Sequence, residues 1–369
     1  MGKFYFFTGG YTEPTKMGSG EVVPGRCKGI TCYEFDEETE NLIRLAVTSP
    51  VPNPSYVLVD PKAPYLYCVN ELKDYEGIDG STVSAYEIRS GTGELRLLNK
   101  QFTCGADACY LAFSPDGKYL MTANYSGGSF CLFPILSDHS LGHASCVLRH
   151  QGKGVNGERQ EGPHPHQMLL SPNEKYVYVA DLGLDCLMGY AANWEKGWLL
   201  PEKELNIPGI PGQGMRHGIF DKDGTHLYVM TEMACQVNVY QYEKESGHGE
   251  LIQTISAMPK DCNVPSLGAA VRLHPNGKWL YASVRGSNHL AVFHIEKEGK
   301  LKLVQIQDSG GEIPRDFILS PDGKYLLAGH QDTDTICIFK VDQESGKLAF
   351  FLTERDVYCV TVLAVWPGR

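Results

Sequence analysis

Apolar and polar residues alternate in short segments along the whole chain, and each segment follows a tight turn. In SPDGKYLMTANY, for example, Pro-Asp-Gly makes the turn and alternating apolar residues lead to a polar end. This alternation is the pattern of a half-buried β-strand. The phrase occurs six times, as DPKAPYLYCVNE from Asp60, SPDGKYLMTANY from Ser114, SPNEKYVYVADL from Ser171, DKDGTHLYVMTE from Asp221, HPNGKWLYASVR from His274 and SPDGKYLLAGHQ from Ser320.

The copies recur at intervals of about fifty residues, which is typical of the blades of a β-propeller, each a four-stranded sheet. In the third copy we expect strand A over residues 166–172, B over 175–182, C over 186–193 and D over 198–207. The Gly-His and Trp-Asp marks of WD40 repeats are missing.

The two ends of the chain complement each other. Residues 4–12, 29–35 and 42–49 resemble strands B, C and D without an A, whereas residues 358–365 resemble an A strand with nothing after it. Pairing them makes a seventh blade and leaves no open sheet edge. The sequence therefore predicts an all-β, seven-bladed β-propeller, a single domain over residues 1–369, whose ring is closed by pairing of the C-terminal strand with the N-terminal strands.

Composition narrows the function. The chain has 369 residues, 42% of them hydrophobic, and a net charge of −11, which argues against a nucleic-acid partner. Because no stretch of about eighteen apolar residues occurs, we expect no membrane span. The 12 cysteines form no CxxC pair, so zinc and disulfides are not expected. We expect a cytoplasmic monomer or weak homo-oligomer that needs no cofactor and no metal.

The repeat also locates candidate functional residues, because equivalent positions lie at the same end of every blade. The starts of strand A are Ser55, Cys109, His166, Arg216, Ala269 and Arg315. The ends of strand B are Glu71, Tyr125, Leu182, Glu232, Arg285 and Gln331. Strands A and B are antiparallel neighbours, so both sets should surround one mouth of the central channel.

Any single charge at a strand end is more often a solvated rim group than a functional one. Five such groups at equivalent positions of four successive blades are harder to dismiss: His166, Arg216, Glu232, Arg285 and Arg315. Like charges packed around a narrow channel repel one another and lose hydration, so the cluster indicates a site for a small anionic ligand. The segment DLGLD, residues 181–185, is a better candidate for a turn that caps strand B than for a metal site.

Several motifs in this order resemble the lactonase family of seven-bladed propellers, which includes the cycloisomerase-type 6-phosphogluconolactonases and is related to carboxy-cis,cis-muconate lactonizing enzymes. The motifs are GGYT, VNE at 69–71, ANYSGG at 123–128, GPHPH at 162–166, GMRH at 214–217, VRGSN at 284–288 and PRDF at 314–317. Met215, Val284 and His330 depart from the usual pattern, but the neighbouring arginines and histidine remain.

The resemblance implies a catalytic set of His166, Glu232, Arg216 and Arg285, with either His166 or Glu232 as the base. Expected substrate-binding residues are Arg315, His164, His217, Glu71, Tyr125 and Gln331. The first hypothesis is a hydrolase that opens a phosphorylated sugar δ-lactone in carbohydrate metabolism, on the pentose phosphate route. A muconate-type lactonizing cycloisomerase and a non-catalytic propeller that binds a sugar acid remain alternatives.

Overall fold

Each of the six repeats forms a four-stranded antiparallel sheet in the computed structural model, which describes residues 2–17 and 20–366. From the channel outward the first three sheets contain β6 (Tyr56–Val59), β7 (Tyr65–Asn70), β10 (Thr82–Ile88) and β11 (Leu95–Phe102); β12 (Ala108–Phe113), β13 (Tyr119–Asn124), β14 (Ser129–Pro134) and β15 (Cys146–Arg149); and β16 (Pro165–Leu170), β17 (Tyr176–Asp181), β18 (Cys186–Asn193) and β19 (Trp198–Pro201).

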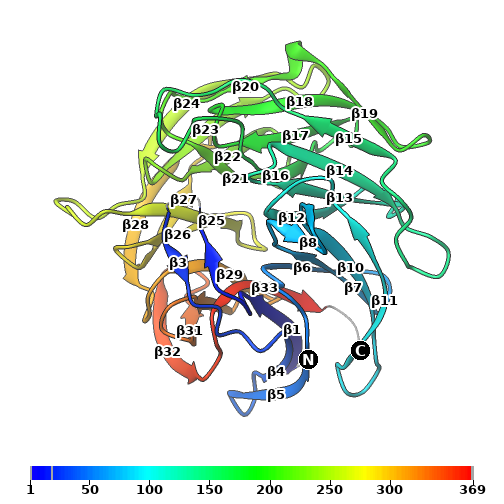
Figure 1. Ribbon diagram of the computed structural model, residues 1–369. Coiled ribbons are helices and arrows are strands. Elements are labelled where there is room, and N and C mark those ends of the chain that lie inside the picture. Colours follow the sequence, from blue (N-terminus) through cyan, green and yellow to red (C-terminus); the bar gives the residue numbers. More distant parts are fainter. Residues whose placement is uncertain (1, 18–19, 367–369) are drawn as a thin grey trace.

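The next three sheets repeat the same order around the ring, which Figure 1 shows. They contain β21 (Met215–Phe220), β22 (His226–Thr231), β23 (Gln236–Tyr242) and β24 (Gly249–Ser256); β25 (Leu267–Leu273), β26 (Trp279–Arg285), β27 (His289–Ile295) and β28 (Leu301–Asp308); and β29 (Pro314–Leu319), β30 (Tyr325–His330), β31 (Thr335–Val341) and β32 (Leu348–Arg355).

The seventh blade is built from both ends of the chain, as the sequence predicts. Its inner strand is β33 (Val360–Trp366), followed outward by β1 (Lys3–Gly10), β4 (Ile30–Asp36) and β5 (Asn41–Thr48). The inner strand β33 also contacts the inner strands β29 and β6 of the two adjacent blades. The closed seven-bladed propeller is therefore confirmed.

Buried tyrosines explain one position of the repeated sequence motif, an aromatic residue in the second strand of the blade. In four blades a tyrosine of the second strand donates a hydrogen bond to a backbone carbonyl in the outer turn of the next blade. The pairs are Tyr67 with His139 (3.1 Å), Tyr178 with Gly247 (2.6 Å), Tyr228 with Gly299 (3.0 Å) and Tyr281 with Gly346 (2.8 Å). Each ring fills the space between two blades while its hydroxyl finds a partner, as a buried tyrosine requires.

One strand differs from the prediction. Residues 198–207 do not form a single outer strand, because β19 ends at Pro201 and a 3-10 turn, η1 (Lys203–Leu205), precedes the short strand β20 (Ile207–Pro208). Both β19 and β20 pair with β18. Proline has no N–H to continue the ladder, and the turn buries Leu205. None of the described segments forms a helix with the length and apolar character that crossing a bilayer demands.

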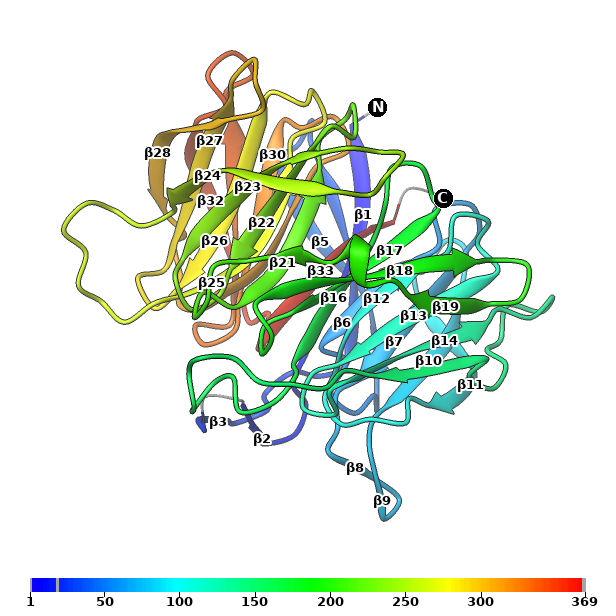
Figure 2. The ribbon, with the colours of Figure 1, turned by 90° about the horizontal axis from the view of Figure 1, so that it is seen from above.

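Two small hairpins extend the same face of the ring, as Figure 2 shows. One is β2 (Thr15–Lys16) with β3 (Val22–Val23), and the other is β8 (Asp74–Tyr75) with β9 (Ile78–Asp79). The first hairpin belongs to the connection between β1 and β4, and its residues Lys16 and Glu21 line the mouth of the channel.

Candidate active site

The inner strands carry β-bulges at the positions that the repeat selects. The pairing of β16 with β17 skips His166, that of β21 with β22 skips Arg216, and that of β29 with β30 skips Arg315. Cys109 is skipped in the same way on β12. A bulge leaves one residue out of the ladder and re-aims its side chain, which is how bulges are used beside active sites.

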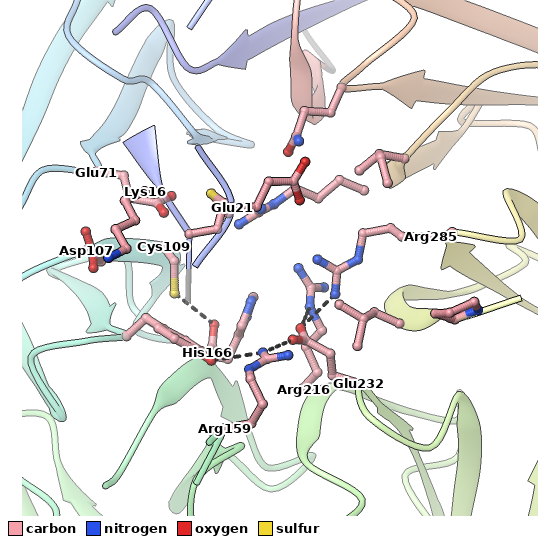
Figure 3. Close-up of a pocket in the computed structure, with 18 residues that line it drawn as sticks. Lys16, Glu21, Glu71, Asp107, Cys109, Arg159, His166, Arg216, Glu232 and Arg285 are labelled. Atoms are coloured by element: carbon pink, nitrogen blue, oxygen red, sulfur yellow. Dashed lines mark hydrogen bonds and ion pairs between the residues drawn. The ribbon is translucent and has the colours of Figure 1, made fainter. Parts of the chain in front are cut away.

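These side chains meet in one cavity of about 210 Å³ at the mouth of the channel (Figure 3). This volume lies below the range of about 300–1,000 Å³ that is common for ligand sites. Eight of the sequence-predicted residues line it: His166, Arg216, Glu232, Arg285, Arg315, Glu71, Tyr125 and Gln331. They come from β7, β13, β16, β21, β22, β26, β29 and β30 or from the residue that directly follows each strand.

The two remaining predicted residues, His164 and His217, support the wall instead of lining the cavity. His164 stacks on the ring of Tyr125, with 4.5 Å between ring centroids. His217 lies edge-on to His166 at 5.0 Å and to Tyr110 at 5.6 Å. Both histidines therefore hold cavity-lining rings in place and do not face a ligand directly.

Glu232 is held by three arginines. Its Oε2 accepts a hydrogen bond from Arg216 Nε at 3.0 Å and forms an ion pair with Arg285 Nη2 at 2.8 Å, while Oε1 pairs with Arg159 Nη2. Only 4% of Glu232 is exposed. The carboxylate thus neutralises part of a dense positive cluster and fixes its geometry.

The surroundings determine the protonation of this cluster. Burial alone raises the pKa of Glu232, but Arg285, Arg216 and Arg159 outweigh it and hold the pKa well below the ordinary value. Burial and the charge of Arg285 lower the pKa of Arg216 to about 9, so this guanidinium is still protonated at neutral pH. Glu232 is therefore a permanent carboxylate whose oxygens are already occupied, which makes it a weak proton acceptor.

His166 is a better proton acceptor. Burial and the charge of Arg216 lower its pKa well below the usual value, so the imidazole is neutral at neutral pH. Its Nδ1 is buried and has no hydrogen-bond partner among the described residues. A neutral imidazole beside a cavity can take a proton from water.

Arg315 also lines the cavity, and its guanidinium lies 5.6 Å from the ring centroid of Tyr11. Within the described part of the chain, Arg315 forms no ion pair. Burial lowers its pKa, but the nearby Tyr11 and Glu71 raise it, with a net upward shift. Arg315 is thus a charged group that is free to receive an anion.

Arg159, which was not predicted from the sequence, lies in the connection between β15 and β16. Residue Gln160 pins this connection, since its amide donates to Asp185 Oδ2 at 2.7 Å and to the Leu182 carbonyl at 2.9 Å. Asp185 also accepts from the backbone N–H of Gly214, two residues before Arg216. One carboxylate therefore positions both loops that deliver arginines to Glu232.

Eight other lining residues were not predicted: Lys16, Met17, Glu21, Asp107, Pro265, Leu267, Gly286 and Ile313. Tyr11, which donates a hydrogen bond to the lining residue Glu71, was not predicted either. Tyr11 directly follows β1, and this is the position of Glu71 after β7 and of Glu232 after β22. No turn of the repeat precedes β1 of the seventh blade, so the repeat does not mark the position of Tyr11.

In residues 2–17 and 20–366, no group of three or more His, Cys, Asp or Glu side chains is arranged to hold a metal ion. Asp181 of the segment DLGLD accepts from the backbone N–H groups of His164 (2.8 Å) and Leu184 (3.1 Å), and its other oxygen contacts His150 Nδ1. These contacts occupy the carboxylate, as a structural cap requires.

A closed propeller with a buried histidine and an arginine cluster at its channel mouth defines a small-molecule site for an anionic ligand. The chain matches the family model of the lactonases with a 7-bladed β-propeller over residues 5–364. It belongs to this family. The 6-phosphogluconolactonase of Bacillus subtilis is 32% identical over 349 residues, which cover 94% of each chain.

Solved structures agree with this assignment. A periplasmic gluconolactonase from Pseudomonas aeruginosa has a TM-score of 0.90 and 29% identity, covering 98% of this chain and 99% of that one. A protein of Bacteroides fragilis, described as a candidate 6-phosphogluconolactonase, has a TM-score of 0.87 and 34% identity, covering 99% and 98% of the two chains.

Proposed function

We propose that this protein is a hydrolase that opens the δ-lactone of 6-phosphogluconolactone. The observation that carries the proposal is the set of side chains that line one cavity. His166, a neutral imidazole, lies beside Arg216 and Arg285, and Arg315 forms no ion pair with a carboxylate of the described residues. Arg216 and Arg285 suit an ester carbonyl, and Arg315 suits a phosphate.

His166 is the proposed base. It takes a proton from a water molecule, whose oxygen attacks the lactone carbonyl carbon, and negative charge develops on the carbonyl oxygen. Arg285 retains a buried Nε that no described group accepts from, and Arg216 adds a fixed positive charge. Preorganised donors of this kind stabilise an oxyanion in a site that excludes water. Glu232 keeps the arginines in position.

Arg315 is the proposed anchor for the phosphate. A guanidinium binds phosphate through two parallel N–H donors, and no competing carboxylate of the described residues pairs with it here.

Arg315→Gln should therefore remove most of the preference for the phosphorylated substrate. We expect the ratio of kcat/KM for 6-phosphogluconolactone to that for gluconolactone to fall about 10- to 100-fold, as for the loss of a hydrogen bond to a charged group. The rate with gluconolactone should change little. Arg89→Gln, which removes an exposed arginine paired with Glu94, is the matched control.

The same assay, corrected for spontaneous lactone opening, separates the alternatives. Retention of the full preference by Arg315→Gln would place the phosphate elsewhere. Turnover of a carboxymuconate instead of either lactone would make the protein a cycloisomerase. Binding of lactones without turnover would make it a non-catalytic binder.

We further propose that residues 1–369 act as one domain in the cytoplasm, within carbohydrate metabolism, as a monomer or weak homo-oligomer. In support, all 12 cysteines are free thiols, as a reducing compartment favours, and one chain supplies every residue of the cavity. Cell fractionation and analytical ultracentrifugation test these two points.

A further inference from the structure

The cavity contains a second buried carboxylate, Glu71, on the wall opposite Glu232. Glu71 follows β7 and Glu232 follows β22, and their blades are three places apart, the largest separation in a ring of seven. Figure 3 accordingly draws Glu71 at the left and Glu232 at the lower right of the site. A ligand that fills the cavity lies between the two carboxylates.

One carboxylate oxygen of Glu71, Oε2, is available to a ligand. Its Oε1 accepts a hydrogen bond from Tyr11 OH at 2.9 Å, whereas its buried Oε2 makes no hydrogen bond of full geometry among the described residues, although the Ser55 hydroxyl acts on the carboxyl group. Only 6% of Glu71 is exposed, yet it lines the cavity. Leaving a buried carboxylate oxygen unpaired is costly, so this oxygen is placed for a group of the ligand.

The charges around Glu71 differ from those around Glu232. No guanidinium or ammonium of the described residues forms an ion pair with Glu71, whereas Glu232 has three. The titratable groups that line the cavity with Glu71 or act on its charge are Tyr11, Arg315, Asp107, Lys16 and Cys109, and an adjoining cavity that it also lines adds Glu13, Lys73 and Asp74.

Burial raises the pKa of Glu71 and the charge of Asp107 adds to the rise, whereas Arg315 and the hydroxyls of Ser55 and Tyr11 oppose it, with a net upward shift. Asp107 is itself paired with Lys73 at 2.6 Å. The surroundings push the pKa values of the two carboxyl groups apart, so Glu232 stays ionised and Glu71 is the one that favours the protonated form. Glu71 is the member that can hold a proton.

We propose that Glu71 is the acid that protonates the leaving ring oxygen as the lactone opens, an assignment that rests on the proposed lactone hydrolysis. Water transfers a proton to His166 and its oxygen bonds to the carbonyl carbon, giving a tetrahedral oxyanion. When the carbonyl re-forms, the bond to the ring oxygen breaks, and this oxygen leaves with the electron pair and takes the proton of Glu71. The product is a hydroxy acid, and the His166 imidazolium returns its proton to Glu71 through water.

An acid beside the leaving group is useful because, without a proton, the ring oxygen would leave as an alkoxide. His166 and Glu71 lie on blades two places apart, with Cys109 of the intervening blade between them. Burial raises the pKa of the Cys109 thiol, so this group does not supply the proton at neutral pH. The pKa of His166 is lowered, which favours the unprotonated form that a base needs. The pKa of Glu71 is raised, which favours the protonated form that an acid needs.

Glu71→Gln should lower kcat for 6-phosphogluconolactone about 10²-fold or more, within the usual range for a general acid. The parental enzyme should lose kcat/KM as pH rises through the pKa of Glu71, because the acid must be protonated. Glu71→Gln should lack this basic limb.

Two further variants should shift the basic limb of the pH profile of kcat/KM without removing Glu71. Asp107→Asn removes a negative charge that raises the pKa of Glu71, so the limb should move to lower pH. Tyr11→Phe removes a hydrogen bond that lowers it, so the limb should move to higher pH. A structural role alone predicts no such opposite shifts.

The proposal is overturned if a folded Glu71→Gln protein keeps the parental kcat and basic limb, or if Asp107→Asn and Tyr11→Phe leave the limb in place. Either result leaves lactone hydrolysis intact as long as the parental protein turns over. Failure of the parental protein to open any lactone would instead reject the proposed function.

Discussion

Replacement of Glu232 by alanine should destabilise the protein by about 3–5 kcal/mol, as is typical when one partner of a buried ion pair is removed. The change leaves Arg159, Arg216 and Arg285 together without the carboxylate that separates their charges. Urea unfolding followed by tryptophan fluorescence measures the loss. Because the arginines lose their fixed positions, lactone opening should disappear as well.

Glu245→Ala is the matched control, since Glu245 forms an exposed ion pair with Lys175 and its loss should not be measurable. The pKa of Glu232 is depressed below its ordinary 4.5 in the folded protein. Its stabilising contribution is therefore complete above about pH 4.5 and is lost as the pH falls through the folded pKa. A Glu232→Ala protein as stable as the parent would refute the ion-pair account.

Deletion of residues 359–369 should leave the protein largely insoluble or unfolded. It removes β33, the inner strand of the seventh blade, which buries Val360, Val362 and Leu363 against the rest of the ring. The exposed edge of β1 would then be free to pair with other chains. Sedimentation of the expressed protein and thermal unfolding of any soluble fraction measure the effect.

A synthetic peptide of residues 359–366, added during refolding, is the control. It should pair with β1 and recover soluble protein, whereas a scrambled peptide of the same composition should not. A truncated protein that melts at the parental temperature would contradict the role of β33 in closing the ring.

The fold was predictable because its repeat is local. Each copy contains a turn and an alternating strand, and both follow from short-range chemistry, as in SPDGKYLMTANY from Ser114. The outer strand around Pro201 was not predicted correctly, since a proline and a buried leucine decide there between a long strand and a turn. Such a decision depends on packing against β18.

The sequence predicted only those site residues that occupy repeated positions of the blades. His166, Arg216 and Arg315 are bulged residues at equivalent positions, so counting from the turn finds them. Arg159 lies in a connection that no other blade shares, and only the contact of Gln160 with Asp185 aims it at Glu232. His217 shows the opposite error, because the side chains of adjacent strand residues point to opposite faces. His164 precedes β16 and stacks on Tyr125 instead of lining the cavity.

The assignment of catalysis to this cavity is tested most directly by a double variant, His166→Ala with Glu232→Gln, checked for parental secondary structure. The measurement is the initial rate of 6-phosphogluconolactone opening at neutral pH, with the spontaneous rate subtracted. We predict a fall in kcat of at least about 10²-fold, because a general base contributes about 10²- to 10⁴-fold. A folded double variant that opens the lactone at the parental rate would contradict the assignment of catalysis to this cavity.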